Sequence, residues 1–574
     1  MARIVADLIT DVLHAAGVRR IYGVVGDSLN GLTDSLLRKK TIDWVHVRHE
    51  EVAAFAAGAE AALTGGLAVC AGSCGPGNLH LINGLYDCHR TRVPVLAIAA
   101  QIPSAEIGRN YFQETRPEEL FRGCSSFCEL VSHPSQLPGV LEAAIRSAVG
   151  KRGVSVVVIP GDVALEEYEA AFSTAAALML RQPVVSPAEM EVAALAEMLN
   201  AGKMVTLFCG RGCQGAHAEV LALADALKAP VVHALGGKEH VEWDNPFDVG
   251  LTGMLGFSSG YEAMKSCDTL LMLGTDFPYR QFYPTEAKIA QVDLRAENLG
   301  HRTKLDLAIV GDVKATIAAV LPRLAPRTER SHLDMALANY VKAREGLDDL
   351  AKGGGRGPVH PQHLVRLLSE QASDDAVFSF DVGTPTVWAA RYLKMNGKRR
   401  MLGSLSHGSM ANALPQAIGA QASFPGRQVI SLCGDGGFTM LMGDFLTLRQ
   451  LDLPVKVVVF NNGALGFVAL EMRGAGFLEM GTELKNPDFA AMARAVGIHG
   501  VRVEQPDDLD GAVRDVLAHP GPALLDVVVS QQELVMPPTI AAAQVKGFGL
   551  WALRAVMNGR GDALIDLART NLLR

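Results

Sequence analysis

One strand–loop–helix–strand pattern in the C-terminal half constrains this chain more than any other feature. An apolar segment of strand composition, Gln428–Cys433, ends at Gly434-Asp435-Gly436, and a second, Leu453–Phe460, ends at Asn461-Asn462. Between them, Met440–Leu451 has the pattern of a helix. This order predicts a parallel sheet, in which neighbouring strands end at the same edge, and open α/β sheets bind ligands at that edge.

The residues at the two strand ends predict a cation site. Asp435 offers a carboxylate and Asn462 offers an amide oxygen, both beside a glycine loop. Such oxygens suit a hard octahedral cation that is shared with a phosphate group. Gly-Asp-Gly alone is more simply interpreted as a tight turn, but the asparagine pair after the second strand favours the cation.

The alternation of strand and helix patterns predicts three α/β domains, each a doubly wound parallel sheet. We place them at residues 1–182, 183–335 and 336–532, and we assign residues 533–574 to an amphipathic tail. The clearest linker is the glycine-rich segment Ala351–Pro361.

A weak repeat connects the first and third domains. At an offset of 360 residues Val69 aligns with Val429, and Pro94-Val95 aligns with Pro454-Val455. Gly75 stands where Asp435 would be in the first copy, so we expect a shared fold with different ligands.

Composition and charge exclude several classes of protein. The 574 residues carry a formal net charge of −8, which argues against general nucleic-acid binding. None of the nine cysteines forms a C-x-x-C pair, which fits a reducing compartment. The N-terminal residues mix acids with apolar positions, unlike a signal peptide, and apolar runs such as Val93–Ile102 are too short to span a bilayer. We therefore expect a cytoplasmic protein.

The end of the tail has helical periodicity. Leu564, Leu567, Ala568 and Leu572 share one helical face, and the charged residues lie elsewhere. Two interpretations stay open: docking on the protein itself, or an anchor that lies in a membrane interface. Because acids are as numerous as bases there, a regulated anchor is favoured over a constitutive one.

The strand-end motif resembles the diphosphate-and-magnesium motif of thiamine-diphosphate enzymes. The resemblance implies that Mg²⁺ is bound by the side chains of Asp435 and Asn462 and by the backbone carbonyl of Ala464. It also implies cofactor contacts from the flanking residues Gly434, Gly436, Gly437, Gly463, Leu465 and Gly466.

Glu50 opens an alanine-rich helix, Glu50–Ala62, where an acid usually complements the helix dipole. The segment Arg48-His49-Glu50-Glu51 resembles the glutamate segment of the thiamine-diphosphate decarboxylases and oxidases. By that resemblance Glu50 hydrogen-bonds N1′ of the aminopyrimidine and favours its imino tautomer. The resemblance further implies that Gly408-Ser409-Met410 binds the cofactor, with Met410 beneath it; without the family, Met410 reads as a core residue.

The middle region contains the pattern G-x-G-x-x-G, Gly210 to Gly215, after a strand. This pattern is the dinucleotide signature in its expected context, although a structural glycine turn explains it equally well. With two further loops and a strand that ends in an acid, the region resembles the FAD domain of flavin-containing family members. The implied FAD contacts are Gly210, Gly212, Thr252, Gly253, Met254, Leu255, Thr275, Asp276, Phe277, Pro278, Tyr279 and Asp293.

Three apolar residues, Phe112, Val382 and Phe467, align with positions that line the active site of the resembled enzymes. Resemblance makes them catalytic-cleft residues together with Glu50, with Phe467 near the electron route. Without it they are ordinary core residues.

The whole chain resembles the bacterial quinone-dependent pyruvate oxidases. That resemblance implies oxidative decarboxylation of pyruvate to acetate and CO2, with electrons passing through FAD to membrane ubiquinone. It also implies a homotetramer that binds membrane lipid through its tail, at the inner face of the cell membrane when activated. Two alternatives remain: a carboligase similar to acetolactate synthase with structural FAD, and a catalytically silent thiamine-fold binding protein.

Overall fold

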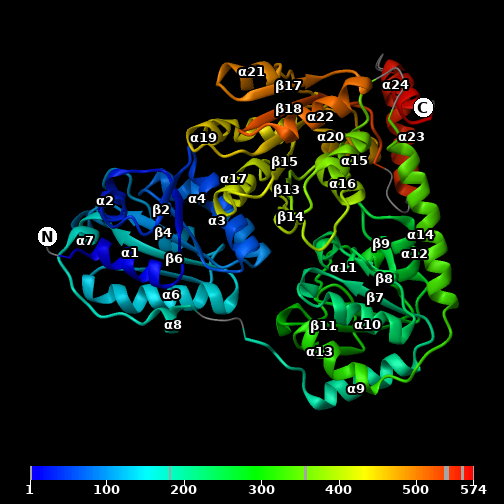
Figure 1. Cartoon of the computed structure of the whole chain (residues 1–574), viewed down its shortest axis with the longest axis horizontal. Helices are drawn as coiled ribbons and strands as arrows, with labels where there is room; N and C mark the ends of the chain where they lie inside the picture. The colour runs from blue at the N-terminus through cyan, green and yellow to red at the C-terminus, as the bar shows by residue number, and fades with distance from the viewer. Residues whose placement is uncertain (1–2, 180–182, 354–357, 536–541, 558–560, 573–574) are drawn as a thin grey trace.

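The computed structural model describes residues 3–179, 183–353, 358–535, 542–557 and 561–572. Figure 1 shows three α/β lobes, coloured blue to cyan, green, and yellow to orange along the chain. Each lobe is built on one six-stranded sheet, and its paired strands are parallel. The predicted fold class of three doubly wound parallel-sheet α/β domains is confirmed.

The first sheet has the strand order β2-β1-β3-β4-β6-β5. Its central strands are buried on both faces, as expected for continuous apolar runs in a parallel sheet. The strands are β1 (Arg20–Gly23), β2 (Asp43–His46), β3 (Ala68–Gly72), β4 (Val95–Gln101), β5 (Phe127–Leu130) and β6 (Val154–Pro160). The helices are α1 (Val5–Ala15), α2 (Asn30–Lys39), α3 (Glu50–Thr64), α4 (Pro76–Thr91), α5 (Pro117–Leu120), α6 (Leu137–Lys151), α7 (Gly161–Leu165) and α8 (Ala175–Leu178).

The third sheet has the order β14-β13-β15-β16-β18-β17, which is the order of the first sheet shifted by twelve strands. The weak sequence repeat therefore reflects a shared topology. The strands are β13 (Val377–Phe380), β14 (Arg400–Gly403), β15 (Val429–Gly434), β16 (Lys456–Asn461), β17 (His499–Val503) and β18 (Ala523–Val528). The helices are α15 (Pro361–Gln371), α16 (Thr384–Tyr392), α17 (Ala413–Ser423), α18 (Asp435–Met440), α19 (Phe445–Gln450), α20 (Gly466–Gly474), α21 (Phe489–Ala495) and α22 (Leu509–Ala518).

The middle sheet has a different order, β12-β11-β10-β7-β8-β9. The strands are β7 (Val205–Cys209), β8 (Val231–His233), β9 (Asp248–Leu251), β10 (Thr269–Leu273), β11 (Lys288–Asp293) and β12 (Leu307–Val310). The helices are α9 (Glu189–Ala201), α10 (His217–Leu227), α11 (Lys238–Val241), α12 (Ser258–Lys265), α13 (Val313–Val320) and α14 (Ser331–Leu350).

The limits of the predicted domains stay predictions. Helix α14 runs across the limit placed at residue 335 and buries His332, Leu333 and Ala336. Residues 180–182, at the first limit, and residues 354–357, within the predicted linker, lie outside the described residues.

The helix predicted over Met440–Leu451 was placed wrongly. Helix α18 already begins at Asp435, and a 3-10 turn at Met442–Asp444 separates it from α19. The glycine loop itself becomes helical because Gly436 and Gly437 have no Cβ, which would lie 2.6 Å from Leu465 Cδ2 and 2.3 Å from Asp381 Oδ2 respectively.

The tail packs on the third domain. Helix α23 (Ala542–Met557) lies against α20, and α24 (Gly561–Leu572) follows it, as the red segments of Figure 1 show. Trp551 is buried, and the Arg473 guanidinium lies 5.2 Å from the centre of its ring. The half-buried Leu564, Leu567 and Ala568 form the predicted apolar face, but the side chain of Leu572 lies outside the described part. In the described helices, no segment is long and apolar enough to cross a bilayer.

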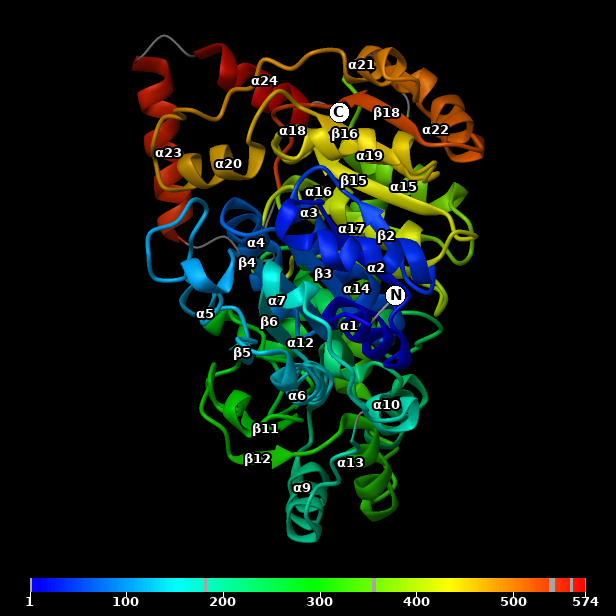
Figure 2. The same cartoon turned by 90° about the vertical axis from the view of Figure 1, so that its left-hand side faces the viewer.

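Helices α3 and α17 join the first domain to the third. Both views place them side by side (Figure 2), and both are rich in small buried residues. The closest approach is at Gly419, where a Cβ would lie 2.1 Å from the carbonyl oxygen of Ala56. Backbone contact across this interface therefore depends on glycine.

Replacing Gly419 by alanine is expected to destabilise the protein by about 1–3 kcal/mol, because the added methyl forces α3 and α17 apart. Urea unfolding of both proteins measures the difference. Gly511→Ala is the matched control, since nothing lies within 4 Å of a Cβ on this exposed position of α22. That variant should be as stable as the natural protein or slightly more so. Equal effects of the two substitutions would contradict the interface argument.

Candidate functional site

Asp435 and Asn462 meet at the carboxyl edge of the third sheet. Gly434 of β15 pairs with Phe460 of β16, so the two residues follow the ends of adjacent strands, as predicted. Asp435 is 2% exposed, and its Oδ2 accepts a hydrogen bond of 2.7 Å from the N–H of Gly463. The loop after β16 therefore folds directly over the carboxylate.

The surroundings of Asp435 suit a cation. Burial raises the pKa of this carboxyl group, because removal from water disfavours its charged form, and the hydrogen bonds from its neutral donors offset the rise only in part. The Nδ2 of Asn486 donates to Asp435 Oδ2 (2.7 Å) and to Asn461 Oδ1 (2.9 Å). The sequence reasoning missed Asn486, which lies 51 residues from Asp435. A cation beside Asp435 would offset the cost of burying its charge.

The three predicted metal ligands all offer oxygen atoms and lie just after neighbouring strands. The amide Oδ1 of Asn462 accepts from the N–H of Ala464 (3.0 Å), and the carbonyl of Ala464 accepts from the N–H of Gly466 (2.9 Å). Each of these oxygens keeps a lone pair, and with the Asp435 carboxylate they form the all-oxygen set that Mg²⁺ prefers. The residues present fit the predicted ion.

A cavity of about 230 Å³ opens beside these ligands. Asn462, Ala464 and Gly466 line it on one side, and Arg473 and Glu533 on another. It lies between α20 and the end of the third sheet, so movement of α20 would change its size.

The glycine loop brings two more predicted residues to Asp435. A Cβ on Gly436 would lie 2.6 Å from Leu465 Cδ2 and 3.4 Å from Met410 Cε. The loop is supported from below by Asp381, whose two oxygens accept from the N–H groups of Ala413 (2.9 Å) and Gly434 (3.1 Å). Burial raises the pKa of Asp381 to about 7.

Glu50 lies at the first position of α3 and is 7% exposed. Its Oε2 is 2.9 Å from Nδ1 of His80 on α4, and its Oε1 faces Gly77, where a Cβ would approach to 3.1 Å. The backbone N–H of Arg48, two residues earlier, donates to Asp444 Oδ1 (2.9 Å) of the third domain. His80 and Asp444 were not predicted; Asp444 lies 396 residues from Arg48, so no local signal points to it.

The single chain brings only some of the predicted residues together. Ser409 joins the first domain through its Oγ, which accepts from Asn83 Nδ2 (2.9 Å). Val382 and Phe467 are half-buried at the edge of the third domain, whereas Phe112 is 78% exposed on a loop of the first. Among the hydrogen bonds and ion pairs of the described residues, none joins Glu50 to Asp435, Asn462 or Met410.

The predicted FAD residues gather at the carboxyl edge of the middle sheet, after β7, β9, β10 and β11. Thr252 is buried, and its Oγ1 has no hydrogen-bond partner in the described structure. Phe277 is buried among aromatic rings, and Asp276 forms an ion pair with Arg302. The remaining positions, Gly253, Met254, Leu255, Thr275, Pro278 and Tyr279, lie on the same loops.

The G-x-G-x-x-G pattern does not adopt the usual dinucleotide geometry. The N–H groups of Gly210 and Gly212 donate to the carbonyls of Leu273 (2.9 Å) and Gly274 (3.0 Å), and α10 begins only at His217. The glycine N–H groups therefore close the loop against β10. At Asp293 the carboxylate accepts from the side chain of Asn298 (2.9 Å). These contacts favour the structural interpretation of the pattern.

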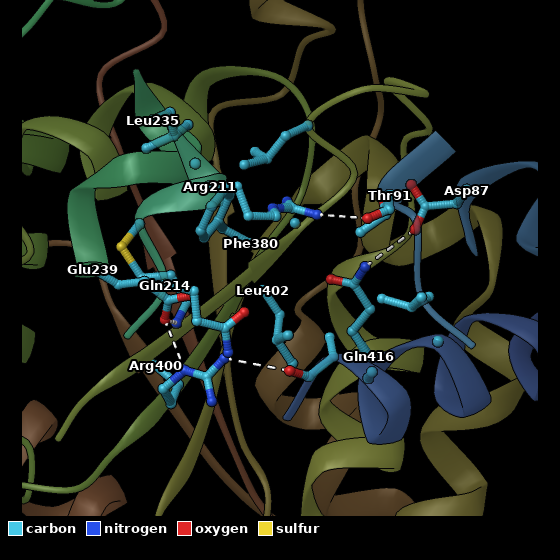
Figure 3. A pocket seen from close by; sticks show the side chains of 18 of the residues that line it. Asp87, Thr91, Arg211, Gln214, Leu235, Glu239, Phe380, Arg400, Leu402 and Gln416 are labelled. Carbon is cyan, nitrogen blue, oxygen red and sulfur yellow. Dashed lines mark hydrogen bonds and ion pairs between the residues drawn. The ribbon is translucent and has the colours of Figure 1, made fainter. Parts of the chain in front are cut away.

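A second, smaller cavity of about 60 Å³ lies where the three domains meet (Figure 3). Arg211 donates to the carbonyl of Thr91 (3.1 Å) across this junction, and Arg400 pairs with Glu239 (2.9 Å). Burial raises the pKa of Asp87, on the opposite wall, to about 6. With Arg152 also in the lining, the cavity carries more positive than negative charge and suits an anionic group.

Three family descriptions match the chain, one in each domain. Residues 3–120 match "Thiamine pyrophosphate enzyme, N-terminal TPP binding domain", and residues 192–320 match "Thiamine pyrophosphate enzyme, central domain". Residues 381–527 match "Thiamine pyrophosphate enzyme, C-terminal TPP binding domain".

Several curated proteins are similar to the chain. An "uncharacterized 42.6 kDa protein in isoamylase 3'region" of Pseudomonas amyloderamosa is 72% identical over 60% of this chain and 87% of its own. The "putative thiamine pyrophosphate-containing protein YdaP" of Bacillus subtilis is 36% identical over 95% of both chains. The pyruvate oxidase of Lactiplantibacillus plantarum is 32% identical over 90% of this chain and 87% of its own. Acetolactate synthases of Zea mays and Oryza sativa match 93% of this chain at 29–30% identity.

Proposed function

Because this chain belongs to the family of thiamine pyrophosphate enzymes, we propose that it oxidatively decarboxylates pyruvate to acetate and CO2 and passes the electrons through FAD to a membrane quinone. The observation that carries the proposal is the buried Asp435 carboxylate beside the oxygens of Asn462 and Ala464. The similarity to a pyruvate oxidase supports the choice of pyruvate.

In this proposal the third domain holds the diphosphate end of the cofactor. Asp435, Asn462 and the carbonyl of Ala464 bind Mg²⁺, which neutralises the buried carboxylate. The glycines at the start of α18 would leave room for the diphosphate beside Asp435. When bound, thiamine diphosphate supplies a carbon nucleophile and an electron sink for decarboxylation.

Glu50 supplies the acid–base function of the protein. Its Oε1 has no hydrogen-bond donor among the described residues, so it is free to bind N1′ of the aminopyrimidine. Burial keeps water away from that bond and strengthens it. Met410 lies beside the glycine loop, where its side chain can support the cofactor from beneath.

The cofactor-binding residues of one chain need a second copy. Among the described residues no hydrogen bond joins Glu50 to Asp435, and Phe112 exposes most of its ring. A partner that places its third domain against the first domain would complete the site and cover Phe112. We therefore propose dimers that pair into a homotetramer.

FAD in the middle domain is supported by two features. Thr252 has an unpartnered buried hydroxyl at the predicted flavin loop, and three arginines against two carboxyl groups line the small cavity at the domain junction. Arg211 and Gln214 connect that cavity to the Gly210–Gly212 loop. Phe467, the second residue of α20, then lies near the electron route from the substrate side of the third domain.

A carboligase similar to acetolactate synthase is the second candidate. Plant acetolactate synthases match almost the whole chain. A silent binding protein is disfavoured, because Glu50, Asp435 and Asn462 are all present in the sequence.

One anaerobic experiment separates these functions. Flavin absorbance is followed near 450 nm, the usual band of oxidised flavin, after pyruvate is added with thiamine diphosphate and Mg²⁺, and then a soluble quinone is added. We expect bleaching by pyruvate and recovery with quinone. A flavin that stays oxidised while CO2 and a carbon–carbon condensation product form would select the carboligase, and cofactor binding without CO2 would select the silent protein.

We further propose that the tail binds membrane lipid at the inner face of the cell membrane. Its apolar side chains Leu553, Val556 and Met557 are exposed on α23 although Trp551 is buried on the same helix. Deleting residues 552–574 is expected to leave activity with an artificial dye and to remove activation by lipid vesicles. The control is Met190→Glu, an exposed apolar position on α9 far from the tail, which should respond to lipid normally. Equal lipid stimulation of the truncated protein would contradict the anchor.

A further inference from the structure

The Glu50 carboxylate is buried, yet the described structure gives it a single hydrogen-bond partner. Nδ1 of His80 lies 2.9 Å from Oε2. A carboxylate only accepts hydrogen bonds, so the proton of this bond belongs to His80 Nδ1. The other oxygen, Oε1, lies over Gly77 and stays free for a ligand.

The orientation of the His80 ring is fixed by its neighbours. Its ring stacks on that of His49, with 4.3 Å between the centres and 24° between the planes. His49 is itself held in place, because its Nδ1 accepts from the N–H of Glu51 (3.2 Å) at the start of α3. The His80 side chain is nevertheless 45% exposed, so packing alone does not account for its position.

From this geometry we propose that His80 is a positioning residue for Glu50. By donating to Oε2, His80 holds the carboxylate in the one rotamer that presents Oε1 to N1′ of the aminopyrimidine. The inference rests on the proposed function. It adds that His80, on α4, sets how fast the bound cofactor loses its C2 proton.

Loss of the His80 donor would weaken this arrangement in two ways. The carboxylate could turn about its last torsion, which is broad for a terminal sp³–sp² bond. It would also lack its only protein donor in a buried position, and hydrogen bonds to charged groups are the stronger ones. Either change places the oxygen less accurately against the pyrimidine ring.

Two substitutions separate the donor from the ring. His80→Phe keeps the aromatic contact with His49 but removes the N–H group. His80→Asn places an amide N–H near the position of Nδ1 and restores a donor. The readout is the loss of the C2 proton of bound thiamine diphosphate. Its rate is measured by NMR as hydrogen–deuterium exchange without substrate.

We expect C2 exchange to slow about tenfold or more in His80→Phe and to return to within about threefold of the natural rate in His80→Asn. Thiamine diphosphate affinity should stay unchanged, because Mg²⁺ and the diphosphate hold the cofactor. Natural exchange in His80→Phe, or equal slowing in both variants, would overturn the proposal.

A cofactor-free measurement tests the pair itself. In a double-mutant cycle, thermal unfolding of the apoprotein is measured for His80→Phe, Glu50→Leu and the double variant, since leucine removes the acceptor that glutamine would keep. Non-additive changes in melting temperature are expected, and additive ones would overturn the bond. If pyruvate fails to bleach the flavin while coupling and exchange behave as expected, then only the proposed function fails.

Discussion

Asp435→Ala is expected to abolish magnesium-dependent binding of thiamine diphosphate, with a loss of affinity of about 100-fold or more, similar to the removal of a buried charge partner. The substitution removes the charged member of the three proposed ligands and leaves the neutral oxygens of Asn462 and Ala464. Calorimetric titration with the cofactor, with and without Mg²⁺, measures the change.

The control for this variant is Asp452→Ala. Asp452 belongs to the same domain, but its side chain is 81% exposed and pairs with Arg449 at the surface. It should bind the cofactor normally. If Asp435→Ala retained magnesium-dependent affinity, then the site assigned to the strand ends would be wrong.

The same carboxyl group gives a dependence of stability on pH. Burial raises the pKa of Asp435 above 3.8 in the folded protein, so the folded state holds this proton to a higher pH than the unfolded chain. Its contribution to the free energy of unfolding therefore falls as the pH rises from 3.8 through the folded pKa. Mg²⁺ bound with the cofactor should offset this loss of unfolding free energy at neutral pH. Thermal unfolding of the natural protein and of Asp435→Ala, each with both ligands present, measures the size of the offset.

Glu50→Gln is expected to lower kcat about 10²- to 10⁴-fold, the range that a positioned acid–base group contributes. Glutamine has the same shape, but its amide cannot exchange a proton with N1′, so cofactor affinity should be preserved while turnover is lost. Steady-state kinetics of pyruvate oxidation, with cofactor binding measured in parallel, reports both quantities.

Glu370→Gln is the matched control, because Glu370 is a surface residue that pairs with Arg366 on α15. It should keep natural kcat and natural affinity. A Glu50→Gln enzyme that turned over at the natural rate would remove Glu50 from the mechanism, whatever the state of the metal site.

Local patterns in the sequence were sufficient for much of the architecture. Apolar runs that end at Gly434 and at Asn461-Asn462 predicted β15 and β16 to within a few residues, and their order predicted the adjacent parallel strands that bring Asp435 to Asn462. These predictions succeeded because strand pairing in a parallel sheet follows from the periodicity and order of short segments.

Patterns failed where a close approach between distant segments decides the backbone. The start of α18 at Asp435 depends on Leu465 and Asp381 packing against glycines that lack a Cβ. The glycines of the middle domain resemble a dinucleotide loop in sequence, yet the carbonyls of β10 take up their N–H groups. Neither contact leaves a signal in the local sequence.

The sequence by itself therefore determined the three parallel sheets and the strand ends at which Asp435, Asn462 and Asp293 lie, whereas their strand orders came from the structure. Only the tertiary structure decided which hydrogen-bond partners the site residues have. Asn486 bonds to Asp435, Asp444 to the backbone of Arg48, and His80 to Glu50. Periodicity fixes which face of an element is buried, because it acts over neighbouring residues. Hydrogen bonds between elements depend on how whole layers pack, and a buried carboxylate selects its partners only after that packing has formed.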